Sequence, residues 1–140
     1  MPQPVMVDAG PFIALFNRDD RFHAQALALV KKHRGPLLST LAVVTEVMYV
    51  LDELPAAQAD FLTWVSSGAV ELVEPENADL QRVVVLMKKY ADLPMDFTDG
   101  VLVALCERLN LRRVASVDRH FSIYRPHGTQ RFTNVFPAAP

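Results

Sequence analysis

Short apolar runs alternate along this chain with longer segments in which apolar residues recur at helical spacing. Apolar runs of this length are typical of buried strands, and the segments between them are long enough for helices. Strands separated by helices pair in parallel, with the helices covering both faces of the sheet. The sequence therefore predicts an α/β fold, a three-layer α/β/α sandwich with a central, mostly parallel sheet of four to five strands. Four strands are predicted at Val5–Val7, Leu37–Leu38, Val70–Val73 and Arg113–Ser116, and a fifth, at the edge, within Thr129–Phe136.

Helix limits follow from the residues that begin and end helices. Pro11 and Pro55 suit the first turn of a helix, and Ser39 or Thr40 suits a cap. Gly68 is predicted to end the helix that Pro55 begins. The predicted helices cover about Pro11–Phe16, Phe22–His33, 41–51, 55–67, Asn77–Tyr90 and Phe97–Leu109.

Composition places the chain among ordinary folded domains. A length of 140 residues predicts one domain, 1–140, with Pro137–Pro140 expected to be frayed. The longest apolar runs are too short to span a bilayer, and the N-terminal segment shows no signal peptide, so we expect a cytoplasmic protein with no membrane partner. A single cysteine, Cys106, excludes an internal disulfide and any cysteine-rich zinc site.

Five acidic residues stand in mostly apolar surroundings. They are Asp8, Glu46, Asp96, Asp99 and Asp118. Asp8 and Asp118 closely follow predicted strands, and ligands of parallel sheets bind beyond the carboxyl ends of the strands. Carboxylates among apolar neighbours are unfavourable unless something positive lies between them. If the five converge, a hard divalent cation such as Mg²⁺ or Mn²⁺ is the expected partner, which points to chemistry on phosphates.

Each acid also has a structural interpretation. Asp8 and Asp118 could cap helices or turns, and Asp96 with Asp99 fits a capping box. Glu46 lies among apolar helix residues, where an arginine partner would account for it. Individually these signals are weak, and the convergence of the acids is what gives them weight.

Charge is distributed unevenly along the chain. Residues 1–107 hold 8 Lys/Arg and 15 Asp/Glu, whereas residues 108–140 hold 6 Arg and one acid, Asp118. An arginine-rich end near an acidic cluster suits a polyanion that must approach a metal, although scattered surface arginines explain the same pattern.

The order and spacing of the acidic motifs resemble those of the PIN-domain family, in particular the VapC-like toxins of bacterial toxin–antitoxin pairs. The resemblance covers nearly the whole chain and rests on VDAGPFIALFNRDDRFH, LLSTLAVVTEVMYVL and LPMDFTDGVLVALCERLNLRRVASVDRHFSIYR. It implies a PIN-like sandwich and a Mg²⁺- or Mn²⁺-dependent endoribonuclease. In that family pattern Ser116 stands where threonine is more usual, Gly100 where alanine is common and His120 where some relatives carry another acid.

The resemblance also implies roles for particular residues. Asp8 and Asp99 would be the principal metal ligands, Glu46 and Asp118 would complete the acidic pocket, and Asp96 would be an auxiliary acid. Apart from the resemblance, Arg119, Arg125, Arg112 and Arg113 are candidates for contacting the RNA backbone, although ordinary surface charge explains each of them separately. Ser116 could orient a ligand water or merely finish its strand. A cognate antitoxin protein and a homodimer are the implied partners, besides RNA.

Two other classes compete with the nuclease. A phosphotransferase with Asp8 as nucleophile would want a second aspartate where this chain has Gly10. A non-catalytic PIN-like module that binds RNA or protein is the other alternative. All four core acids of the family pattern are present, which favours the enzyme.

Overall fold

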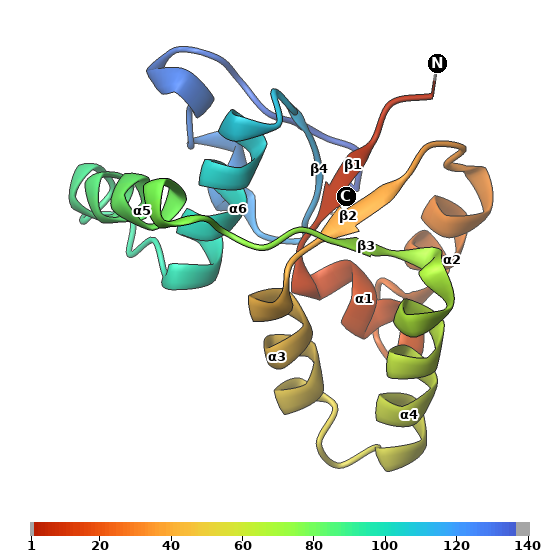
Figure 1. The fold of residues 1–140 in the computed structure, drawn as a ribbon. Helices are drawn as coiled ribbons and strands as arrows, with labels where there is room; N and C mark the ends of the chain where they lie inside the picture. Colours follow the sequence, from red (N-terminus) through yellow and green to blue (C-terminus); the bar gives the residue numbers. More distant parts are fainter. Residues whose placement is uncertain (1, 137–140) are drawn as a thin grey trace.

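A computed structural model describes residues 2–136 and confirms the α/β architecture (Figure 1). The sheet has the order β3-β2-β1-β4-β5, and every pair of neighbouring strands is parallel. The central strand β1 is buried along its whole length, as expected for a strand covered on both faces. The predicted frayed tail, Pro137–Pro140, lies outside the described residues. The strands are β1 (Val5–Val7), β2 (Leu37–Ser39), β3 (Glu71–Leu72), β4 (Arg113–Ala115) and β5 (Thr133–Asn134).

Helices flank the sheet on both sides, so the predicted three-layer arrangement is confirmed. In Figure 1, α5 and α6 lie on one side and α1 and α2 on the other. All six predicted helices are present, with limits that differ by a few residues: α1 (Ala9–Phe16), α2 (His23–Lys32), α3 (Leu41–Val50), α4 (Pro55–Trp64), α5 (Asn77–Lys89) and α6 (Phe97–Arg108). Short helical turns follow at η1 (Val65–Ala69), η2 (Arg119–Ser122) and η3 (Pro126–Gly128). None of the helices within residues 2–136 has the length and apolar character needed to cross a membrane.

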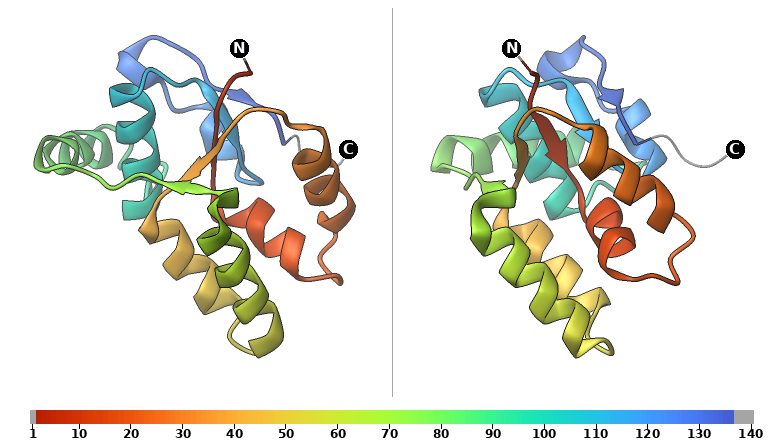
Figure 2. Two further views of the ribbon diagram at one scale, coloured as in Figure 1. Left: turned by 45° about the vertical axis from the view of Figure 1, so that its right-hand side comes forward. Right: turned by 90° about the vertical axis from the view of Figure 1, so that its right-hand side faces the viewer.

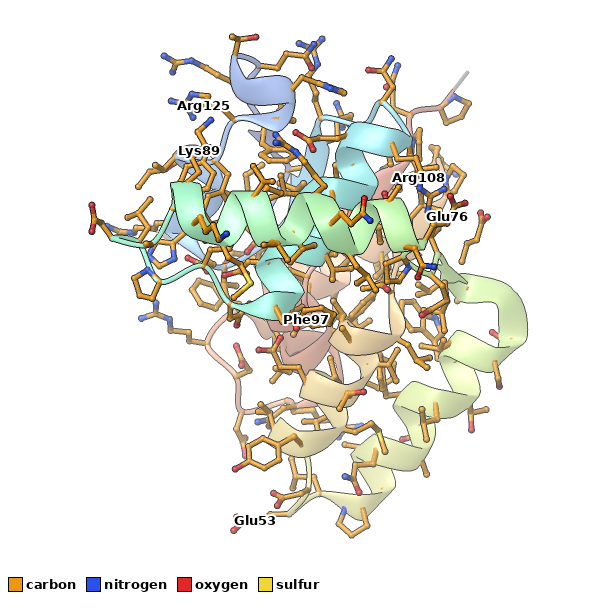
Figure 3. The ribbon with its side chains drawn as sticks, turned by 60° about the vertical axis from the view of Figure 1, so that its left-hand side comes forward. Glu53, Glu76, Lys89, Phe97, Arg108 and Arg125 are labelled. Carbon is orange, nitrogen blue, oxygen red and sulfur yellow. The ribbon has the colours of Figure 1, made fainter. Side chains whose placement is uncertain are left out.

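Helix α6 is the buried helix of the fold. Its residues from Asp99 to Cys106 are all buried, which is the pattern of a helix covered on all sides. Helix α5 packs on it, and two ion-paired contacts join the helices: Arg82 donates two hydrogen bonds to Glu107, and Arg108 donates to Asp79. Arg108 also lies beside Glu76, at the start of α5 (Figure 3).

Helices α3 and α4 project beyond the sheet, and α1 contacts both of them (Figure 2). Four aromatic side chains, Phe12 and Phe16 of α1 with Phe61 and Trp64 of α4, form a cluster with ring centroids 5.5–5.9 Å apart. Tilted and edge-on rings at these distances are favourable aromatic packing. This aromatic cluster fixes α4 against the helix that begins directly after β1.

Because all neighbouring strands are parallel, their carboxyl ends lie along one side of the sheet, here called the carboxyl edge, and their amino ends along the other, the amino edge. Asp8 follows β1, and Ser116 and Asp118 follow β4, at the carboxyl edge. Arg113 begins β4, at the amino edge. Asn110, with a positive φ of 55°, turns the chain at the end of α6, and Leu111 N–H donates to the Cys106 carbonyl at 2.8 Å. The carboxyl edge therefore collects acids, and the amino edge receives the chain that enters β4.

Candidate functional site

Asp8 and Asp118 are held together at the carboxyl edge by one serine. Asp8 is the N-cap of α1, with Oδ1 accepting from Ala9 N–H at 2.8 Å. The Ser116 hydroxyl donates to Asp8 Oδ2 at 2.9 Å and accepts from the Asp118 N–H at 2.9 Å. Ser116 is fully buried, so its hydroxyl is committed to these two contacts. Asp8 therefore caps α1, as its structural interpretation predicts, and is also linked to Asp118 through Ser116.

Gly10 permits the close approach of the two segments that carry these acids. A β-carbon at Gly10 would overlap Cγ2 of Val117, at a separation that side chains do not tolerate. Because Gly10 is in the first turn of α1 and Val117 precedes Asp118, the missing side chain lets α1 and the end of β4 meet.

Asp96 and Asp99 form the predicted capping box at the start of α6. Asp99 N–H donates to Asp96 Oδ1 at 2.8 Å, and Asp96 N–H donates to Asp99 Oδ2 at 3.5 Å. Asp96 is exposed, whereas Asp99 is only 8% exposed. A cap needs no burial, so the buried position of Asp99 calls for a second explanation.

Tyr124, which the sequence pattern did not single out, contacts Asp99. Its hydroxyl donates to Asp99 Oδ2 at 3.3 Å, and its ring is fully buried against Tyr90 and Phe121. The sequence gives little indication of this contact, because Tyr124 follows Asp118 by six residues and its distance along the chain from Asp99 matches no regular element. This contact and the one from Asp96 N–H both use Oδ2, and no hydrogen bond formed within residues 2–136 occupies Oδ1.

Asp99 and Asp118 also share a neighbour in His120. One ligand atom from each of the three residues lies within 4.8 Å of the others, a spacing that one cation can bridge. His120 Nδ1 lies 3.3 Å from Asp118 Oδ1. A neutral imidazole nitrogen would suit Mn²⁺ better than Mg²⁺, whose ligands are mostly oxygens.

Glu46 faces the same cluster from α3. It is half-buried, and none of the ion pairs formed within residues 2–136 gives it an arginine partner. Burial, together with the negative charges of Asp8, Asp96 and Asp118, raises the pKa of its carboxyl. The arginine that would have explained Glu46 structurally is therefore missing from the described contacts.

The electrostatics of the cluster are those of carboxylates brought together without compensation. Burial raises the pKa of Asp99 to about 7, and the charges of Asp96, Asp8 and Asp118 add to the effect. Burial also raises the pKa of Asp8. Among the described residues, Asp8, Asp96 and Asp99 have no cationic side chain within ion-pair distance. Oxygen donors that repel each other in this way suit a divalent cation.

The four predicted RNA-contacting arginines fall into three environments. Arg119 lines a cavity of about 280 Å³ beside Ser116 and Asp118. Arg125 donates from its guanidinium to the carbonyls of residues 122, 123 and 124, which fixes the turn after η2. Arg112 and Arg113 lie at the amino edge, away from the acids. Arg119 thus shares a cavity with one acid of the cluster, Asp118.

The fold and the site together define an α/β/α domain with a carboxylate cluster at the carboxyl edge of a parallel sheet. A PIN domain model matches residues 5–125, and the chain belongs to the PIN domain family. The resemblance seen in the sequence motifs is confirmed.

Individual relatives are similar over most of their length. Ribonuclease VapC26 of Mycobacterium tuberculosis is 27% identical over 134 residues, which cover 94% of this chain and 99% of that protein. The crystal structure of M. tuberculosis VapC20, described as a sarcin-ricin loop cleaving toxin, matches with a TM-score of 0.78 at 17% identity, covering 85% of this chain and 93% of that one. A Klebsiella pneumoniae toxin–antitoxin complex matches with a TM-score of 0.63 at 16% identity, over 81% and 86% of the two chains.

Proposed function

We propose that this protein is a metal-dependent endoribonuclease, the toxin of a toxin–antitoxin pair. The observation that carries the proposal is the group of mutually repelling carboxylates, Asp8, Asp99 and Asp118, gathered at one edge of the sheet with no cationic side chain in ion-pair contact with Asp8 or Asp99 among the described residues. Membership of the PIN domain family and the similarity to a protein named as a ribonuclease support it.

In this proposal Asp8, Asp99 and Asp118 hold Mg²⁺ or Mn²⁺, and Glu46 completes the pocket. The cation supplies positive charge to the scissile phosphate and makes water a stronger acid, so that a nucleophile is available near neutral pH. Ser116 and Tyr124 position Asp8 and Asp99 through their hydroxyl groups. Glu46, the half-buried acid on α3, orients the attacking water and accepts its proton.

Cleavage of RNA tests the proposal directly. Purified protein is stripped of metal and incubated with a labelled structured RNA, with Mn²⁺, with Mg²⁺ and with chelator. We expect cleavage only with metal, leaving a 5′-phosphate and a 3′-hydroxyl. A folded protein that binds RNA but leaves it intact in every metal would instead support the non-catalytic binding module.

Ser116→Ala should weaken catalysis without unfolding the protein. The substitution removes the hydroxyl that donates a hydrogen bond to Asp8 and accepts one from the Asp118 N–H. Loss of a hydrogen bond that orients a metal ligand typically costs about 10- to 100-fold in activity or metal affinity. Initial cleavage rates and Mn²⁺ affinity by calorimetry measure the effect. Ser116→Thr keeps the hydroxyl and is the matched control; equal losses in both variants would contradict the role of the hydrogen bond.

The metal-free protein should become less stable as pH rises from about 4 to about 7. The pKa of Asp99 is about 7 in the folded protein and 3.8 in the unfolded chain. Between these values the folded state binds more protons than the unfolded state, so the free energy of unfolding falls with rising pH. The raised pKa values of Asp8 and Glu46 act in the same direction.

Thermal melts measure this dependence. The melting temperature of the metal-free protein should be higher at about pH 5 than at about pH 8, and Mn²⁺ should raise it most at the higher pH. Asp99→Asn is the control, because it removes a carboxyl whose pKa is raised to about 7 and should reduce the dependence of the melting temperature on pH. A wild-type profile that matches that of Asp99→Asn would show that the carboxylates do not repel as the geometry implies.

An antitoxin and a second copy of the chain are the proposed partners. The Klebsiella complex and a VapBC2 complex from Rickettsia felis, similar to this fold at 11% identity and a TM-score of 0.66 over 94% of this chain and 98% of that one, support an antitoxin. Exposed apolar side chains on α3 and α5, Leu41, Tyr49, Val50, Val84 and Val85, support an interface between copies. Light scattering of the free protein tests the dimer.

A further inference from the structure

The amino edge of the sheet carries a cavity that the proposed catalysis does not use. We define it as the amino-edge cavity. It has a volume of about 840 Å³ and is built from the segment that enters β4 and the segment that enters β5. Its lining includes Arg112, Arg113 and Arg131, with Asn110, Gln130 and Thr133 between them.

The charge of this cavity is uncompensated. None of the described side chains that line it is acidic, and within residues 2–136 none of its three guanidinium groups takes part in an ion pair. This contrasts with Arg82 and Arg108, which both pair with carboxylates between α5 and α6. Three unpaired arginines around one hollow create a positive potential that attracts anions.

Two of the residues that line the cavity also carry buried polar atoms without partners. Arg113 Nε and Gln130 Oε1 are buried and make no hydrogen bond within the described residues. A buried donor of a charged group without an acceptor is unfavourable, and an oxyanion that reaches it would restore the lost hydrogen bond. Guanidinium groups match the oxygens of phosphate in a planar fork, which makes phosphate the best-fitting anion.

We propose that the amino-edge cavity is a second phosphate subsite, which holds the backbone of the RNA away from the scissile bond. The inference rests on the proposed ribonuclease function, since RNA is the phosphate-bearing substrate. Arg113 and Asp118 are five residues apart on and just after β4, which places the cavity roughly 17 Å from the acids at about 3.3 Å per residue. One RNA strand can therefore reach both sites only if it is several nucleotides long.

Binding without cleavage isolates this subsite from the catalytic site. The affinity of metal-free protein for a fluorescent single-stranded RNA of about 20 nucleotides is measured in chelator over a range of salt concentrations. The test variant is Arg112→Gln/Arg131→Gln, because both side chains are exposed. The matched control is Lys31→Gln/Lys88→Gln, which removes the same charge from exposed positions on α2 and α5.

Loss of two phosphate contacts should lower the slope of log affinity against log salt by about 1.4, from about 0.7 per contact on single strands. That change corresponds to roughly 25-fold weaker binding at about 0.1 M salt if the curves meet at about 1 M. The control variant should keep the wild-type slope. Inorganic phosphate, which can occupy the cavity alone, should bind the arginine variant more weakly than the control variant.

Each outcome separates the subsite from the ribonuclease. Equal slopes for the two double variants, or no binding of RNA by the wild type, would overturn the subsite. If RNA is cleaved normally while the slopes stay equal, the ribonuclease remains and the subsite fails. If RNA is never cleaved but the arginine variant alone loses affinity, the subsite is supported and the catalytic proposal fails. If the arginine variant and the lysine control variant lose inorganic phosphate binding equally, the amino-edge cavity is not a specific phosphate site.

Discussion

Asp99→Asn should abolish RNA cleavage while making the metal-free protein more stable. The asparagine side chain keeps an oxygen that can accept from the Tyr124 hydroxyl and the Asp96 N–H, so the capping geometry is retained. It loses the negative charge proposed to hold the metal. We expect the rate to fall by about 10³-fold or more, equivalent to about 4 kcal/mol of transition-state stabilisation.

The gain in stability has the same origin as the loss of activity. In the wild type, Asp99 is buried among Asp96, Asp8 and Asp118, and the pKa of about 7 reports how unfavourable its charge is there. The neutral amide removes that repulsion at every pH above the pKa. Cleavage assays in Mn²⁺ and urea unfolding in chelator, at about pH 8, measure the two effects on one pair of proteins.

Asp60→Asn serves as the control, since Asp60 is an exposed acid on α4 away from the cluster. It should change neither quantity. Wild-type activity in Asp99→Asn would exclude Asp99 as a metal ligand, and a less stable variant would show that the carboxylate is compensated in the folded protein.

Phe61→Ala should be the most destabilising substitution in the part of the fold that supports the site. Phe61 is fully buried and contacts the rings of Phe12 and Phe16 within the aromatic cluster. Phe to Ala in a core removes the transfer free energy of the ring and leaves a cavity, at a typical cost of about 3–5 kcal/mol. That is a large fraction of the roughly 5–15 kcal/mol of a whole domain.

Urea unfolding followed by far-ultraviolet circular dichroism measures the loss. Leu62→Ala is the matched control, because Leu62 is the next residue of α4 and is 42% exposed. It should cost well under half as much. Equal effects at the two positions would mean that helix propensity rather than the aromatic packing holds α4 on α1.

Local residue chemistry predicted most of the fold, because the strong signals agree with one another. Val5–Val7 is apolar throughout, and Pro55 begins its helix as expected, since these preferences act within a few residues. Limits shifted where a side chain acted at a helix end: Asp8 caps α1, so the helix starts two residues before Pro11. Thr40 is the N-cap of α3, yet no side-chain cap hydrogen bond forms there.

The sequence predicted only part of the site. The acids could be grouped because most of them follow a strand or begin a helix, and the carboxyl edge collects such positions. Tyr124 could not, because its contact with Asp99 depends on where the chain after η2 lies relative to the start of α6. The C-terminal arginines were grouped by charge alone, and charge does not say at which end of β4 each arginine lies. Arg112 and Arg113 lie at the start of β4, whereas Arg119 follows it.

The position of the single tryptophan decides what an optical experiment on this protein can report. Trp64 is half-buried, with its ring centroid 5.9 Å from Phe12 and 5.5 Å from Phe16, so its emission follows the docking of α4 on α1. The side chains of the acidic cluster are absent from its ring contacts in the described part of the chain. A cation that fills the acidic cluster can thus leave the tryptophan spectrum almost unchanged, whereas tyrosine absorption, through Tyr124, will respond. A silent tryptophan signal during a metal titration is therefore no sign that metal has failed to bind.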